Sequence, residues 1–393
     1  MSAQAARRAA GAWVASQSEA VAQAARAMAQ RFRTGGRLLV VGSGSAGPDA
    51  RHVAVEFVHP VIVGKRAVPA VATAADAVAT LARPDDVLVG ISHGTLAGAD
   101  AGALATAGSK GALTVALCGD AHPDGADHAF AVPSDDRLVV REMHVTLYHL
   151  LWELAHVFLD HRGAGEGASD LDALYPFLAE GDGVGDGDDD GDGAALLADA
   201  AQSSREKAEE IASLRERMLE GLANDLDRCA AEVGSALDAG STVWTFGNGG
   251  SSTDADALAE ALLRPPGGAP SGAAVSLSAD VAVTTALAND VGIEVVFARP
   301  LAGMAQAGDV AVGLSTSGNS ANVVTALEEA KRRGLVTVGF AGNEGGRMAE
   351  CGALDHLFVV LSSSVHRIQE AQTTLYHALV EQTSRRLGGA DRP

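Results

Sequence analysis

The sequence predicts an α/β protein of two domains, each a doubly wound parallel sheet with helices on both faces. The chain has 393 residues of which 47% are apolar, enough to build two separate cores. Only 4% of the residues are aromatic, a composition that suits helices packed on parallel strands. Helical and strand patterns alternate, as in VVTALEEAKRRG followed by LVTVGFAG, which indicates βαβ units.

The pattern of elements occurs twice along the chain. The three matching pairs of segments are 37–45 with 241–251, 85–92 with 308–315, and 141–149 with 369–377. The offset between matching positions is 205 residues in the first pair, 223 in the second and 228 in the third. The second domain is therefore expected to carry an insertion of 18 residues between its first two segments, and this insertion contains Asn289 and Asp290.

An acidic, glycine-rich run, GDGVGDGDDDGDG, separates the two copies. It cannot bury apolar surface, and it lacks the closing glutamate of an EF-hand calcium loop. We therefore predict a first domain over residues 1–179, a linker over 180–195 and a second domain over 196–393.

The charge and composition limit the partners. The chain has 50 acidic and 29 basic residues, a net charge of -21, which disfavours nucleic acid and anionic membranes. The three cysteines form no metal-binding or redox spacing, and no apolar run is long enough for a signal peptide or a membrane span. We expect a cytoplasmic protein whose ligand is a small molecule.

Two polar loops of the second domain predict a phosphate site. GNGGSS at 247–252 and STSGNS at 315–320 each follow a predicted strand, where open α/β sheets bind ligands. Glycines allow close backbone approach, while hydroxyls and helix N-terminal amides can surround a phosphate without any cation.

The second domain resembles phosphoheptose isomerase, a member of the sugar-isomerase (SIS) family. The resemblance rests on these two loops, on the AND segment, and on the RIQE run with His377 eight residues after Gln369. The resemblance covers residues 206–386 and implies two SIS domains. It implies aldose–ketose isomerisation between sedoheptulose 7-phosphate and a heptose 7-phosphate. Family tetramers imply a homodimer of this chain that forms a four-domain pseudo-tetramer. The substrate-binding residues that the resemblance implies are Asn248, Gly249, Gly250, Ser251, Asn289, Asp290, Ser315, Thr316, Ser317, Ser320 and Gln369.

The two domains depart from the family in opposite ways. In the second domain, Ala257 and Ala261 occupy the positions of the family's metal-binding histidine and catalytic glutamate. The first domain has His52 and Glu56 at those positions, on one helical face. However, its serine loop has become SHGTLA, the glutamine position is Arg141, and the insertion is absent.

This reciprocal pattern leads to a hypothesis in which the phosphate loops of one domain serve the His52 and Glu56 pair of the other. The catalytic residues would be Glu56, His149 and His377. A divalent metal such as zinc would be held by His52, Glu56, Gln369 and His377, with Arg141 either opposing the metal or stabilising an oxyanion. The alternative function is a non-catalytic sugar-phosphate-binding regulator or scaffold, in which the His52 and Glu56 pair is only a structural remnant.

Overall fold

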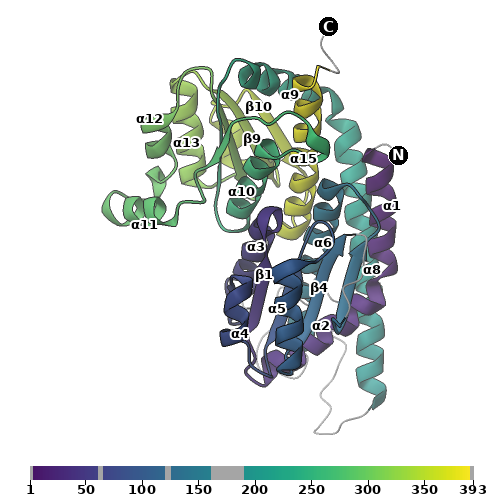
Figure 1. Ribbon diagram of the computed structural model, residues 1–393. Helices are drawn as coiled ribbons and strands as arrows, with labels where there is room; N and C mark the ends of the chain where they lie inside the picture. The colour runs from purple at the N-terminus through teal and green to yellow at the C-terminus, as the bar shows by residue number, and fades with distance from the viewer. Residues whose placement is uncertain (1–2, 61–64, 120–124, 161–189, 390–393) are drawn as a thin grey trace. The chain divides into compact units, whose positions relative to one another are not determined.

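The computed structural model describes residues 3–60, 65–119, 125–160 and 190–389. The chain divides into two compact units, Met1–Ala212 and Ser213–Pro393 (Figure 1). Each unit is an α/β structure, as the sequence predicts. Among the described helices, none contains a stretch long and apolar enough to cross a membrane.

The division between the units lies later than the predicted linker. Residues 180–189 of that linker lie outside the described residues, while residues 190–195 begin helix α8 (Asp190–Gly221). The alanine- and leucine-rich sequence from residue 194 onwards favours continuation of this helix. Leu196, Leu197 and Ala201 pack against the core of the first unit, which explains why the division falls inside α8.

The sheet of the first unit is parallel, with the strand order β2-β1-β3-β4-β5. Its strands are β1 (Leu38–Gly42), β2 (Ala70–Ala72), β3 (Val87–Ile91), β4 (Leu113–Gly119) and β5 (His128–Val132). Strand order reverses between β1 and β3, so the ligand-binding edge of this fold lies at their carboxyl ends.

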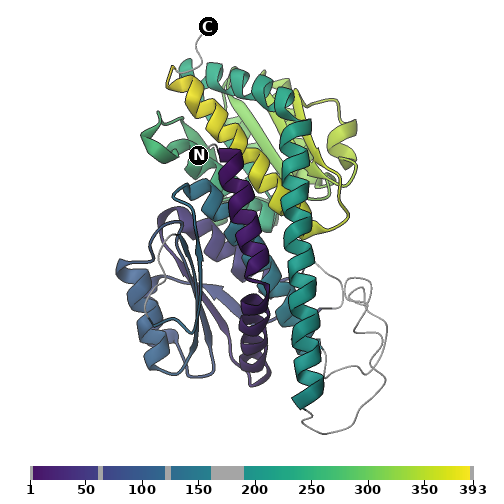
Figure 2. The ribbon, with the colours of Figure 1, turned by 90° about the vertical axis from the view of Figure 1, so that its right-hand side faces the viewer.

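Alternate residues of the strands face two different helical layers. One layer contains α1 (Ala3–Ser16), α2 (Ser18–Arg33), α3 (Gly47–Val58) and α6 (Arg137–Asp160), packed on Leu38 and Val40. The other contains α4 (Val78–Leu81) and α5 (Gly98–Ser109), packed on Leu39 and Val41. Figure 2 shows α1 beside α8, and a Cβ added at Gly11 would lie 3.2 Å from the Cβ of Ala212.

The second unit repeats this topology. Its strands are β6 (Val243–Gly247), β7 (Ala274–Ser276), β8 (Val310–Ser315), β9 (Val336–Gly342) and β10 (His356–Val360), in the parallel order β10-β9-β8-β6-β7. Helices α12 (Ala298–Met304) and α13 (Ala321–Arg332) share one core with Trp244 and Phe246. Helices α9 (Ala223–Asp238), α10 (Gly250–Leu263), α14 (Gly346–Glu350) and α15 (Val365–Leu387) also belong to this unit.

The predicted insertion lies between β7 and β8. It forms α11 (Val281–Asp290), a 3-10 turn over Ile293–Val295 and α12. Between β2 and β3, the first unit has only a 3-10 turn over Ala75–Ala77 and α4. The extra residues of the second unit therefore form two helices before β8, the strand that leads into the serine loop.

Both units fix neighbouring strands with the same threonine–aspartate contact. Thr114 donates to Asp127 from its backbone N–H at 2.8 Å and from its hydroxyl at 2.8 Å. Thr337 donates to Asp355 in the same way, at 3.0 Å and 2.9 Å. In each unit, the aspartate that precedes the last strand thus accepts hydrogen bonds from a threonine near the start of the neighbouring strand.

Candidate functional site

The loop after β6 turns tightly into α10. Gly247 ends the strand, and a Cβ there would lie 2.5 Å from the carbonyl oxygen of Ser251. Gly249 precedes α10 with φ of 53°, a conformation that favours glycine. Gly250 and Ser251 form the first turn of α10, so its backbone amides lie at the carboxyl edge of the sheet.

The loop after β8 is held by its own hydroxyls. Ser315 ends the strand, and its Oγ lies 3.0 Å from Oγ of Ser320 and accepts from the N–H of Gly318 at 3.1 Å. Ser317 Oγ accepts from the N–H of Asn319 at 3.1 Å. Thr316 lies between these serines, and Ser320 is the N-cap of α13.

The two loops meet at the point where strand order reverses, because β6 and β8 are neighbours in the sheet. Asn248 Nδ2 donates to Asn322 Oδ1 at 2.8 Å, and Asn322 Nδ2 donates to Asn248 Oδ1 at 2.9 Å. This pair of amides joins the first loop to the first turn of α13. The arrangement places hydroxyls and helix N-termini side by side, which is suitable chemistry for a phosphate.

Asn289 and Asp290, which the sequence predicted as substrate-binding residues, do not belong to either loop. They are the last two residues of α11, their side chains are exposed, and Asn289 Nδ2 donates to Asp290 Oδ1 at 2.7 Å. Their role in substrate binding stays a prediction.

Helix α15 carries Gln369 and His377, which are 2% and 0% exposed. Gln372 Nε2 donates to the carbonyl of Ser315 at 3.4 Å, and the Tyr376 hydroxyl donates to Asp254 Oδ1 at 3.0 Å. These contacts tie α15 to both the serine loop and α10. Ala257 and Ala261 are buried on α10 at 3% and 5% exposure, so neither position of the second unit offers a proton-transfer group.

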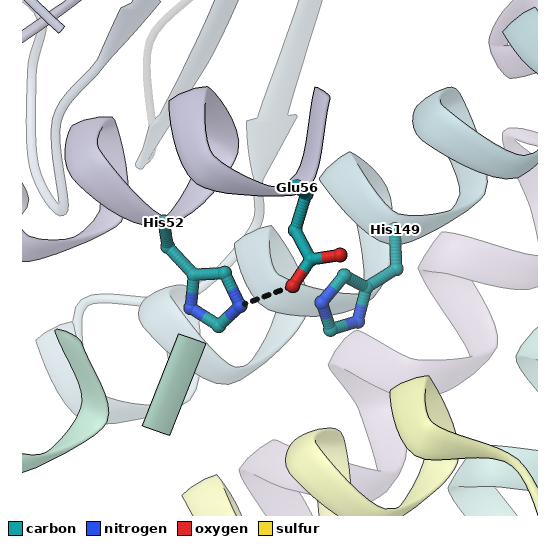
Figure 3. A group of neighbouring side chains, drawn as sticks. All are labelled: His52, Glu56 and His149. Carbon is teal, nitrogen blue, oxygen red and sulfur yellow. Dashed lines mark ion pairs between the residues drawn. The ribbon is translucent and has the colours of Figure 1, made fainter. Parts of the chain in front are cut away.

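In the first unit, His52, Glu56 and His149 form one buried cluster (Figure 3). His52 and Glu56 lie on α3, and His149 comes from α6. His52 Nε2 lies 3.5 Å from Glu56 Oε1, and the two imidazole centroids are 5.4 Å apart. One ligand atom from each residue lies within 4.8 Å of the others.

Two imidazole nitrogens and a carboxylate oxygen are donors that zinc accepts. The sequence predicted metal ligands among His52, Glu56, Gln369 and His377, and His52 and Glu56 lie in this cluster with His149, which the sequence predicted as a catalytic residue. Gln369 and His377 lie on α15 of the second unit. Trp152 Nε1 donates to the carbonyl of Glu56 at 2.8 Å and so fixes the last turns of α3 against α6.

In the first unit, carboxylates bond to the residues that correspond to the phosphate loop and to the glutamine of the second unit. Asp100 accepts from the backbone N–H of Ser43 at 3.1 Å and from its hydroxyl at 3.0 Å. Arg141, which occupies the glutamine position, donates from Nε to both oxygens of Asp49 at 2.9 and 3.2 Å. Arg141 is therefore engaged by a carboxylate on α3.

Burial alone would raise the pKa of Asp49. The positive charge of Arg141 and the hydrogen bond from His93 outweigh that effect and hold the pKa well below its usual range.

Sequence reasoning missed the contacts of Trp152, Asp100 and His93, because each joins segments far apart in the chain.

Comparisons with known proteins agree with this picture. Residues 208–342 match the SIS domain family. The phosphoheptose isomerase of Paramagnetospirillum magneticum is 44% identical over 148 residues, which are 37% of this chain and 76% of that protein. The phosphoheptose isomerase of Aquifex aeolicus is 38% identical over 179 residues, which are 44% of this chain and 90% of that protein.

Solved structures extend the similarity of fold to the whole chain. The C-terminal domain of glucosamine-fructose-6-phosphate aminotransferase from Francisella tularensis aligns with 95% of this chain and 94% of its own, at 13% identity and a TM-score of 0.61. Tagatose-6-phosphate ketose/aldose isomerase from Escherichia coli aligns with 99% of this chain and 92% of its own, at 13% identity and a TM-score of 0.56. At this identity, the likeness establishes the fold.

Proposed function

Because this chain belongs to the phosphoheptose isomerase family of SIS-domain proteins, we propose that it catalyses the aldose–ketose isomerisation of a phosphorylated sugar, with sedoheptulose 7-phosphate as the substrate. The observation that carries the proposal is the buried His52, Glu56 and His149 cluster, which unites a carboxylate base with two imidazoles.

The reaction moves one proton between adjacent carbons and one between the attached oxygens. In the proposal, Glu56 removes the proton from the carbon next to the carbonyl and returns it to the neighbouring carbon. His149, whose ligand atom lies within 4.8 Å of that of Glu56, transfers the proton between the two oxygens. A divalent metal such as zinc, held by His52, Glu56 and His149, would supply Lewis-acid stabilisation of the enediolate.

The substrate phosphate is assigned to the loops of the second unit. Ser251, Ser315, Thr316, Ser317 and Ser320 there offer hydroxyls near the starts of α10 and α13. Gln369 and His377 are assigned to the reacting end of the sugar, and a homodimer of four SIS domains is proposed as the assembly.

The test is turnover of sedoheptulose 7-phosphate by the purified full-length protein, followed as formation of the aldose. Glu56→Gln removes the base and keeps the shape, so we expect kcat to fall about 10²–10⁴-fold with little change in substrate affinity. Glu350→Gln is the matched control, because Glu350 is an exposed residue of α14. Equal turnover in wild type and Glu56→Gln would refute the assignment of the base.

A non-catalytic sugar-phosphate-binding protein is the second candidate, and the buried Ala257 and Ala261 favour it. Binding without turnover, weakened by Ser320→Ala, would select this candidate. Zinc binding that is lost in His52→Ala, measured by calorimetry, would support the metal site whichever function holds.

A further inference from the structure

A second group of side chains in the first unit has the connectivity of a catalytic triad. Ser45 Oγ lies 3.1 Å from His93 Nδ1, and His93 Nε2 lies 2.6 Å from Asp49 Oδ2. We propose that Ser45, His93 and Asp49 act as nucleophile, general base and orienting acid, and that the first unit has an acyl-transfer activity towards carboxylic esters.

The protonation of the three groups suits these roles. Asp49 is fully buried and ionised, since its pKa is held low by Arg141 and His93 against the effect of burial. The short contact from Nε2 to this carboxylate places the imidazole proton on Nε2. Nδ1 is then left with a lone pair that accepts the hydroxyl proton of Ser45. The nitrogen order is the reverse of that in serine proteases, but each ring nitrogen has the same role.

The carboxylate is fixed from two sides. Arg141 Nε donates to both oxygens of Asp49 at 2.9 and 3.2 Å, so the carboxylate cannot turn away from His93. Asp49 is 0% exposed and His93 is 5% exposed. Two of the three members are thus held in a dry, preorganised arrangement, which is what general-base catalysis requires.

The nucleophile is the accessible member. Ser45 is only partly buried, and it lies in the turn between β1 and α3, at the carboxyl edge of the sheet. Gly44, the residue before it, has φ of +58°. A sharp strand-to-helix turn that raises a serine above a parallel sheet is also how α/β-hydrolases present their nucleophile.

Two further side chains lie beside the triad. Arg137 Nη2 donates to Ser45 Oγ at 3.2 Å, and its exposed guanidinium can stabilise the oxyanion that forms beside Ser45. The ring of His144 lies 5.8 Å from that of His93. Burial lowers the pKa of His144 to about 3, so it stays neutral and does not oppose formation of an imidazolium on His93.

Hydrolysis of the ester needs only water as a second reactant. Ser45 Oγ forms a bond to the ester carbonyl carbon while its proton passes to His93 Nδ1. The tetrahedral intermediate then breaks the bond to the alkoxy oxygen, which takes the proton from Nδ1 and leaves as an alcohol. Water then gives one proton to Nδ1 while its oxygen bonds to the carbonyl carbon of the acyl-Ser45 ester. The bond between that carbon and Ser45 Oγ breaks, Oγ takes the proton back from Nδ1, and the carboxylic acid leaves.

This activity is separate from the proposed isomerase. It uses none of His52, Glu56 and His149, so the two proposals can fail independently.

The experiment combines covalent labelling with ester hydrolysis, both with the full-length protein. A fluorophosphonate probe is expected to label Ser45, as located by peptide mass spectrometry, and p-nitrophenyl butyrate is the hydrolysis substrate. Ser45→Ala is expected to abolish labelling and to reduce hydrolysis at least 10³-fold, and His93→Gln to slow both at least 10²-fold.

Ser43→Ala is the matched control, since this serine lies in the same turn but bonds to Asp100. It is expected to keep labelling and hydrolysis near wild type, and thermal unfolding checks that each variant is folded. Ser45→Cys guards against a folding defect in the alanine variant, and it is expected to react with iodoacetamide faster in the presence of His93 than in Ser45→Cys/His93→Gln. Absence of label on Ser45, or labelling at the same rate in His93→Gln, would overturn the proposal.

Discussion

Gly318 provides a sharp test of the phosphate loop, because its geometry forbids a side chain. Its φ is +66°, and a Cβ added there would lie 2.1 Å from the carbonyl oxygen of Gly345. Non-bonded carbon and oxygen atoms need roughly 3.5 Å, so Gly318→Ala must push the serine loop away from the β9–α14 turn. Gly318 also donates to Ser315 Oγ at 3.1 Å and accepts from the N–H of Met348 at 3.0 Å.

The expected cost has two parts. An L-residue in the left-handed region costs about 1–2 kcal/mol. Loss of the two hydrogen bonds adds about 1 kcal/mol each. The free energy of unfolding of the second unit should therefore fall by about 3–4 kcal/mol. Displacement of the Ser315 hydroxyl should also weaken sugar-phosphate binding by at least about 10-fold, the equivalent of 1.4 kcal/mol.

Gly352→Ala is the matched control. Gly352 has φ of +65°, and a Cβ there would meet nothing within 4 Å. It should lose only the conformational part, about 1–2 kcal/mol, and keep the affinity for ligand. Urea unfolding gives the stabilities, and calorimetric titration with sedoheptulose 7-phosphate gives the affinities. Equal losses of stability in the two variants, with unchanged binding in Gly318→Ala, would refute the close-packing argument.

Two further changes test the first unit. Burial lowers the pKa of His144 to about 3 from 6.5, so the folded imidazole is neutral while the unfolded chain takes up a proton as the pH falls. The stability that depends on this neutral imidazole is complete above pH 6.5. It is lost on acidification towards pH 3, with a slope approaching about 1.4 kcal/mol per pH unit. Urea unfolding of His144→Gln across this range should show a free energy of unfolding that falls less steeply with decreasing pH. Trp152→Phe leaves the carbonyl of Glu56 without its indole donor, which should cost about 1–3 kcal/mol and weaken zinc binding in calorimetric titrations. Trp244→Phe removes a comparable indole bond, to Asp309, and should reduce stability while leaving zinc affinity unchanged; equal zinc affinities in both tryptophan variants would contradict a positioning role for Trp152.

Patterns that are local in the sequence predicted the fold well. Apolar strands that end in glycine and serine, such as those before Gly247 and Ser315, predicted the parallel sheets and the edge where their loops meet. The offset between the two copies located the insertion that became α11 and α12. The boundary of the first unit was harder to predict from the sequence, because it depends on the packing of Leu196 and Leu197 against a core formed by distant residues.

The sequence by itself determined two parallel α/β units, the loops that end β6 and β8, and the i, i+4 pair of His52 and Glu56, because each depends on residues close together in the chain. Only the tertiary structure decided that His149 completes the buried cluster, that Asp49 engages Arg141, and that His93 lies between Asp49 and Ser45. These contacts join helices and strand ends that are separated by dozens of residues, and their geometry follows from how the layers pack on the sheet.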